Sequence, residues 1–281
     1  MLGKSLKKNI EMLLILFICV ICSFHYVNSH DESKEKNKSV NFYFDDQVGD
    51  SRRVTTLSQK DIRLNNELIS TTQYKFITNL NVKLSEKKEK ITVGEFFLYQ
   101  KSDKTGDYVL FKKFNTEFTR EKNGFMKMES KYFFPSLKDI PTFPGRGVEI
   151  GQGWEGNAVI SQDLRKYGLA KPVIITVKTH YRYLKNEIIN KKECAVISVY
   201  FIVNQNNKIP IGRQFNKYWI TRNGSFITRW MGIYKTKYYY SFEDKELIKF
   251  DADYNHLFFY ENGNIHEVKG NDKSLVERKR K

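Results

Sequence analysis

Histidines are the first residues in this chain to consider for chemistry, and few of them are placed to act together. His180, His256 and His266 lie in strand-like stretches, and the last two flank the dipeptide Asn262-Gly263. A β-hairpin centred on that dipeptide would pair Phe259 with His266, so the two imidazoles would not face each other. We therefore predict no metal site there and expect the three histidines to be partly exposed strand residues.

Two pairs of adjacent acids, Asp45-Asp46 and Glu243-Asp244, are the next candidates. A catalytic carboxylate pair needs one member whose pKa is shifted by burial or by a like charge. Both pairs lie in charged, loop-like surroundings, so we expect them to be solvated. The chain also lacks the Gly-x-Ser-x-Gly, Gly-x-x-x-x-Gly-Lys-Ser/Thr and His-Glu-x-x-His patterns of known catalytic sites. The prediction is a protein that is not an enzyme, with no catalytic residue, no cofactor and no metal.

The N-terminus reads as an export segment. Lys4, Lys7 and Lys8 precede the apolar run from Met12 to Phe24. A helix of that length rises about 20 Å, short of the roughly 30 Å hydrocarbon core of a bilayer, which favours a signal peptide over a spanning helix. We predict that residues 1–29 are a signal peptide, cleaved or retained as a short anchor, and that residues 30–40 form a flexible charged leader.

Cleavage after residue 29 would leave Cys194 as the lone cysteine. It lies in the apolar run CAVISVYFIV, so it is expected to be a small buried hydrophobe. The cleaved chain would hold 45 basic and 31 acidic residues, a net charge of +14, because three lysines and Glu11 leave with the segment.

Alternation of apolar and polar residues dominates the rest of the chain. Along residues 173–183, Val, Ile, Val, Thr, Tyr and Tyr occupy one face, and residues 195–203 repeat the pattern. Asn-Gly pairs at 123–124, 223–224 and 262–263, and Asn65-Asn66, indicate hairpin turns. The predicted fold class is all-β and mainly antiparallel, either a long twisted meander sheet or a half-barrel, with two β lobes as an alternative. The β-rich domain is expected to span residues 41–270.

One stretch interrupts the alternation. Residues 134–157 contain three prolines and a cluster of glycines, so they are predicted to connect two halves of the sheet. A connection of this length needs anchors. We predict Phe143, Pro144, Gly151 and Trp154 as structural anchors, with Phe143 and Trp154 buried. Residues 271–281 are rich in basic residues and are expected to form a frayed tail or a short interaction arm.

The net charge of the full chain, +16, limits the partners. Basic residues interleaved with aromatics also occur in nucleic-acid binders, but the export segment and the even spread of lysines argue against nucleic acid. A basic surface outside the cytoplasm suits an anionic lipid or an anionic wall polymer, and a membrane surface is a further candidate partner. Tyr181, Arg182 and Tyr183 are a candidate binding face, because Tyr and Arg are common in recognition surfaces.

Four segments taken in order resemble a known family: 42–76, 132–154, 171–187, and 217–230 together with 261–270. Their order resembles the N-terminal β-rich module of spirochaete OmpA/MotB-like envelope proteins. The resemblance implies a periplasmic module, but Gln152 stands where the family has an acid. The C-terminal OmpA-like domain that binds peptidoglycan in that family is not part of this chain, so that activity is not carried over.

Two functions follow as expectations. The first is a non-enzymatic exported cell-envelope protein, periplasmic or membrane-associated through an uncleaved N-terminal segment, which binds or stabilises another envelope component: an envelope protein, an anionic lipid or a wall polymer. The alternative is a carrier of a lipid or other apolar ligand, because a curved antiparallel sheet rich in aromatics can enclose such a ligand.

Overall fold

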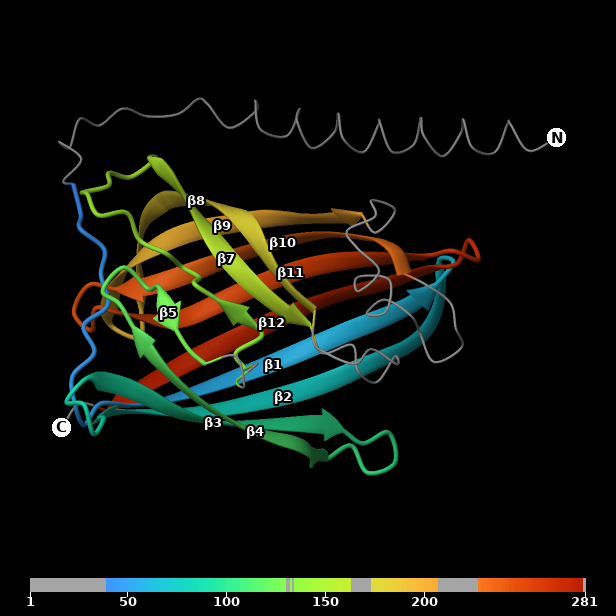
Figure 1. The fold of residues 1–281 in the computed structure, drawn as a ribbon, viewed down its shortest axis with the longest axis horizontal. Helices are drawn as coiled ribbons and strands as arrows, with labels where there is room; N and C mark the ends of the chain where they lie inside the picture. The colour runs from blue at the N-terminus through green and yellow to red at the C-terminus, as the bar shows by residue number, and fades with distance from the viewer. Residues whose placement is uncertain (1–38, 130–131, 133, 163–172, 207–226, 280–281) are drawn as a thin grey trace. The chain divides into compact units, whose positions relative to one another are not determined.

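The computed structural model describes residues 39–129, 132, 134–162, 173–206 and 227–279, and these form a single antiparallel sheet (Figure 1). The sheet has twelve strands in the order β5-β4-β3-β2-β1-β12-β11-β10-β9-β8-β7-β6. The predicted all-β, antiparallel class is therefore confirmed, and the described strands form one sheet, not two lobes. The strands are β1 (Ser51–Leu64), β2 (Glu67–Leu84), β3 (Lys90–Lys101), β4 (Tyr108–Arg120), β5 (Met126–Lys127), β6 (Leu137–Lys138), β7 (Gly153–Gln162), β8 (Val173–Ile189), β9 (Lys192–Asn206), β10 (Ile227–Ser241), β11 (Glu246–Tyr260) and β12 (Ile265–Lys279).

The sheet curls until it is nearly closed. The strands that come first and last in the sequence, β1 and β12, are neighbours in the middle of the strand order. β1 pairs with β12 over fourteen residue pairs, from Ser51↔Lys279 to Leu64↔His266. The gap lies at the other side, where the short strands β5 and β6 cover only parts of β4 and β7. Among the described residues, no helix has both the length and the apolar character needed to cross a bilayer.

Two hairpin turns show how local chemistry sets the pairing. Asn65 and Asn66 both have positive φ, as the two central residues of a type I′ turn require, which confirms the predicted hairpin between β1 and β2. The turn before Ile265 is one residue longer than predicted. Gly263 has a φ of +84°, and Phe258, not Phe259, pairs with His266. The pair 223–224 lies outside the described residues.

The two faces of the sheet differ in character. Many side chains on the inner face are apolar or aromatic and fully buried, among them Tyr183, Ile197 and Phe201, but polar side chains such as Thr116 and Ser274 are buried there as well. The outer face of β10 and β11 carries opposite charges in register, Lys235↔Asp253 and Lys237↔Asp251. Charged side chains in mid-strand are costly against hydrocarbon, so this outer face is suited to water.

Residues 40–46, which precede β1, and the Pro/Gly-rich connection lie against the inner face at one end. Phe42 stacks on Phe143 of the connection and Phe44 is tilted against it, with ring centroids 5.6 and 4.9 Å from that of Phe143. Tyr240 of β10 donates a hydrogen bond to the carbonyl oxygen of Tyr43 at 2.6 Å. These contacts fill that end of the curled sheet with aromatic side chains.

The expectation of a frayed C-terminal tail is wrong for the described part of it. Residues 271–279 continue β12, with Ser274 buried and paired with Thr56. The alternation of side chains in this segment supplies an inner face even though its composition is basic, because every second residue can face solvent. The signal segment 1–29 and residues 30–38 of the leader lie outside the described residues.

Candidate functional site

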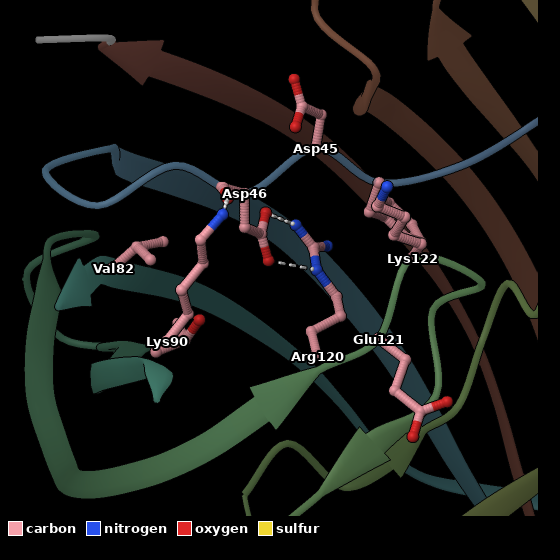
Figure 2. A pocket seen from close by; sticks show the side chains of 9 residues that line it. Asp45, Asp46, Val82, Lys90, Arg120, Glu121 and Lys122 are labelled. Atoms are coloured by element: carbon pink, nitrogen blue, oxygen red, sulfur yellow. Dashed lines mark hydrogen bonds and ion pairs between the residues drawn. The ribbon is translucent and has the colours of Figure 1, made fainter. Parts of the chain in front are cut away.

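A network of buried ions closes the end of the sheet where residues 40–46 lie. Asp46, which precedes β1, contacts two guanidinium groups. One is Arg52 of β1, and the other is Arg120 of β4, whose Nη2 lies 2.5 Å from Asp46 Oδ1 and whose Nε lies 3.0 Å from Oδ2 (Figure 2). Arg120 therefore contacts this carboxylate in a bidentate manner, through two nitrogens. This geometry makes Arg–carboxylate pairs strong and directional.

Glu246, the first residue of β11, joins the same network from the far side. Its Oε2 lies 2.7 Å from Arg120 Nη2 and 2.5 Å from Arg52 Nε. A third pair, Arg278 of β12 with Asp50, lies beside it, and Arg278 also donates to the carbonyl oxygen of Asp45. Three arginines and three carboxylates from five parts of the chain thus meet at one place.

The charges of the network hold its carboxylates ionised. Burial raises the pKa of Glu246, but the positive charges of Arg120 and Arg52 outweigh it and leave the pKa below its usual value. The pKa of Asp46 is lowered in the same way, with burial opposing and Arg120 prevailing. A carboxylate locked in its ionised form by two arginines is a poor general acid or base near neutral pH, because it cannot readily accept a proton. The network is therefore suited to fastening segments together, not to proton transfer.

A pocket of about 360 Å³ lies directly over this network. Its lining brings Lys90, Arg120 and Lys122 together with Asp45, Asp46 and Glu121, and Phe44, Val82 and Thr92 complete it (Figure 2). Lys90 Nζ donates to the carbonyl oxygen of Asp46 at 2.9 Å, and the Arg120 guanidinium lies 3.9 Å from the centre of the Phe44 ring. The pocket is therefore lined by both basic and acidic side chains. Arg120 among them is already paired with Asp46 and Glu246.

Asp46 shows where sequence reasoning failed. We expected the pairs Asp45-Asp46 and Glu243-Asp244 to be solvated, but Asp46 is mostly buried in the network and Asp244 is buried beside Lys192, with 2.7 Å between Oδ2 and Nζ. No sequence pattern joins Asp46 to Arg120 and Glu246, which lie 74 and 200 positions away in the chain. Only the curl of the sheet brings them together.

A second polar cluster lies further along the inner face, around His256 of β11. Trp230 of β10 donates a hydrogen bond from Nε1 to His256 Nδ1 at 3.2 Å, and the two rings meet edge to face. Burial lowers the pKa of His256 to about 4, with Lys60 contributing. The histidine is therefore neutral near pH 7 and serves as an acceptor. The expectation of three partly exposed histidines is wrong for this one, which is buried.

Two glycines make room for the aromatic side chains of β11. Gly232 pairs with His256, and a Cβ there would overlap the His256 imidazole. Gly270 pairs with Tyr254 on the other neighbouring strand, and a Cβ there would overlap the Tyr254 hydroxyl end. The two rings thus lie across glycine backbones on opposite sides of β11, the arrangement by which aromatics cover glycines in sheets.

The four predicted anchors are divided between core and surface. Phe143 and Trp154 are buried, and Trp154 stacks on Tyr181 with ring centroids 5.2 Å apart while its Nε1 donates to the carbonyl oxygen of Thr142 at 2.7 Å. Pro144 is half-buried, and Gly151 is exposed in a turn with a φ of +89°. Gly151 meets β8 through its backbone, donating to the carbonyl oxygen of Tyr183 at 2.7 Å.

The candidate binding face of Tyr181, Arg182 and Tyr183 does not exist as one surface. Tyr181 and Tyr183 are buried in the inner aromatic cluster, whereas Arg182 lies on the outer face and donates from Nε to the carbonyl oxygen of Gly151 at 3.0 Å. Alternation along β8 separates them, because successive side chains in a strand point to opposite faces.

Cys194 is fully buried and unbridged, in a cluster with Val196, Tyr239 and Ile248, which confirms its prediction as a buried hydrophobe. Burial raises the pKa of its thiol to about 11, so it is a poor nucleophile. In the described part of the chain, no three His, Cys, Asp or Glu side chains are grouped to hold a metal ion.

Comparisons with known proteins assign no family. No family model matches the chain, and no curated protein matches it. Among solved structures, an outer membrane channel from Pseudomonas putida F1 aligns with 89% of this chain and 100% of its own length, at 10% sequence identity and a TM-score of 0.30. A similarity at that level carries no argument about function. The resemblance to spirochaete OmpA/MotB-like modules stays a prediction.

Proposed function

We propose that this chain is an exported, non-enzymatic binding protein that carries a small apolar ligand against the aromatic inner face of its curled sheet. One observation carries the proposal: among the described residues, the aromatic cluster beside the ion network is largely buried, whereas several aromatic side chains of the inner face further from the network are only half-buried. The rings there that retain solvent exposure are those of Tyr74, Phe76, Phe96 and Phe258, together with the side chain of Leu98.

The pairing of the strands shows which residues lie near the ion network and which lie further from it. β2 and β3 run past each other so that Tyr74 pairs with Gln100 near one end and Leu84 pairs with Lys90 near the other. The network residues Asp46 and Glu246 lie at the second end, and Tyr74 lies towards the first. Apolar surface that remains accessible on a concave face is what binding sites for apolar ligands share.

Export is the second part of the proposal, and it rests on the N-terminal sequence. A basic start followed by a thirteen-residue apolar run, Met12 to Phe24, is typical of a secretory signal. N-terminal sequencing of the protein purified from its source tests it. A mature chain that begins near residue 30 supports export, and a chain that begins at Met1 in the cytosol contradicts it.

Ligand binding is tested with two neighbouring phenylalanines that point to opposite faces. Phe96 lies on the inner face against Phe134, with 5.5 Å between ring centroids, whereas Phe97 lies on the outer face beneath Lys113. We expect Phe96→Ala to weaken the binding of a fluorescent apolar probe, 1-anilinonaphthalene-8-sulfonate, at least fivefold. The matched variant Phe97→Ala should bind as the parent does.

Mass spectrometry of the native protein completes the test, because a carrier should retain an apolar molecule through purification. Absence of any co-purified apolar molecule, together with equal probe binding by the Phe96→Ala and Phe97→Ala variants, would overturn the carrier proposal. Far-UV circular dichroism of both variants checks that the sheet is intact.

A further inference from the structure

The start of β4 exposes four consecutive large apolar side chains. Tyr108, Val109, Leu110 and Phe111 are 37%, 58%, 51% and 62% exposed. Exposed apolar side chains are ordinary when they occur singly, but a contiguous run marks an interaction surface or an aggregation hazard. Leu68 and Ile69, at the start of β2, are also more than half exposed, at 55% and 59%.

These residues gather at one end of the sheet. The turns before β2 and before β4 both lie at the end away from the ion network, because β2 and β4 run in the same direction on either side of β3. The incompletely buried rings of the inner face lie towards this same end. The apolar run therefore borders the part of the inner face where we place the ligand.

Lysines surround the apolar run. Residues 101–113 contain Lys101, Lys104, Lys112 and Lys113 against Asp103 and Asp107, a net charge of +2. The two lysines that follow the run lie over phenylalanine rings, Lys112 over Phe114 and Lys113 over Phe97, each with 5.0 Å from Nζ to the ring centre. Aromatic and aliphatic side chains flanked by lysines are the composition of protein segments that sit at the surface of an anionic bilayer.

Strand addition by another protein is the competing explanation, and the geometry disfavours it. Within the described residues, β4 is paired on its outer edge only at Thr119 and Arg120, so the rest of that edge has no strand beside it. A bulge interrupts the edge, since Leu98 pairs with Lys112 and Tyr99 with Leu110, leaving Phe111 without a partner in the register. Bulges and edge lysines are two means by which proteins prevent edge-to-edge pairing.

We propose that the β3–β4 hairpin, residues 101–113, docks this protein on a bilayer with anionic headgroups. Val109, Leu110 and Phe111 enter the interface, and Lys101, Lys104 and Lys112 meet the headgroup phosphates or carboxylates, whereas Lys113 is already paired with Glu95, 2.7 Å from its Nζ. The hairpin borders the proposed ligand site but contains none of its residues, so docking can fail while ligand binding holds.

Flotation with vesicles of phosphatidylcholine alone and with 30% phosphatidylglycerol (a composition chosen for the assay) tests the docking surface on the full chain. We expect binding to the anionic vesicles, weakened at least fivefold by the triple variant V109S/L110S/F111S and by raised salt. The matched control is I174S/I188S/I202S, which removes three apolar side chains of 60%, 66% and 55% exposure on β8 and β9. The control should bind as the parent does.

Three results would overturn the inference. The first is a parent protein that floats with neither vesicle. The second is equal loss of binding in the β4 triple variant and in the control. The third is a parent that sediments as a dimer which the β4 variant abolishes, without vesicle binding, since that would make the edge a protein interface. Because all six side chains are exposed, both variants should keep the parent's melting temperature.

Discussion

Arg120 of β4 and Glu246 of β11 lie 2.7 Å apart although four strands separate them in the order of the sheet. A flat sheet would hold those two strands about 24 Å apart, at about 4.8 Å per strand. The ion pair can form only because the sheet curls, so it also holds the curl in place. Arg52 and Asp46 complete the link from β1 and from the segment before it.

Removing one partner of this network should destabilise the fold strongly. Arg120→Met leaves Asp46 and Glu246 buried with one arginine fewer, and uncompensated buried charge costs roughly 3–5 kcal/mol. Urea unfolding monitored by circular dichroism measures it. The control is Lys178→Met, which removes an exposed pair with Glu155, 2.7 Å long, and should cost under about 1 kcal/mol. Equal losses in the two variants would show that the network does not hold the fold.

Acid should weaken the same ion network. The pKa values of Glu246 and Asp46 are lowered in the folded state, so these groups contribute stability that is fully present above their unfolded pKa values, near 4.5 and 3.8. That contribution is lost as the pH falls through the lower folded values. Unfolding midpoints measured from pH 5 downwards should fall steeply for the parent and less steeply for Glu246→Gln. Parallel curves for the two proteins would contradict this assignment.

Protonation of His256 should lower the stability of the fold over a different pH range. Its folded pKa of about 4 lies below the unfolded value of 6.5, so the unfolded chain takes up the proton first. Stability is full above pH 6.5 and falls as the pH drops towards 4, by up to about 3 kcal/mol at 1.36 kcal/mol per pKa unit. His256→Gln should be less stable at pH 7 but should lose this pH dependence. If the variant keeps the parent's slope between pH 6.5 and 4.5, another group is responsible.

Gly232 is predicted to be intolerant of any side chain. A Cβ at this position overlaps the His256 imidazole, so Gly232→Ala must displace the ring and break its hydrogen bond with Trp230. We expect a loss of about 1–3 kcal/mol, typical of overpacking, and a change in tryptophan fluorescence. Gly145→Ala is the matched control, because a Cβ there meets nothing within 4 Å. An unchanged stability of Gly232→Ala would show that the imidazole is not held there.

Much of the fold could be predicted because its causes are local. Alternation along 173–183 and 195–203 places apolar side chains on one face, and that pattern needs only neighbours in the chain to be read. Asn65-Asn66 sets its turn through the backbone angles that the two asparagines tolerate. The apolar neighbours of Cys194 indicated its burial for the same reason.

The residues that were misjudged owe their surroundings to distant parts of the chain. Asp46 reads as a solvated acid until Arg120 and Glu246 are brought to it. His256 reads as an exposed strand residue until Trp230 and a glycine on the next strand enclose it. The pattern of residues 271–279 gave no indication of a partner, yet β1 pairs with them from more than 200 positions away.

By itself, then, the sequence determined that this chain forms antiparallel strands, where several of them turn, and that apolar side chains line one face. The tertiary structure alone decided how far the sheet curls, and with it which ions are buried and which aromatic side chains of the inner face stay partly exposed. The physical reason is range: strand alternation and turn angles act between neighbouring residues, whereas burial and charge pairing depend on which distant strands the closed curl places together.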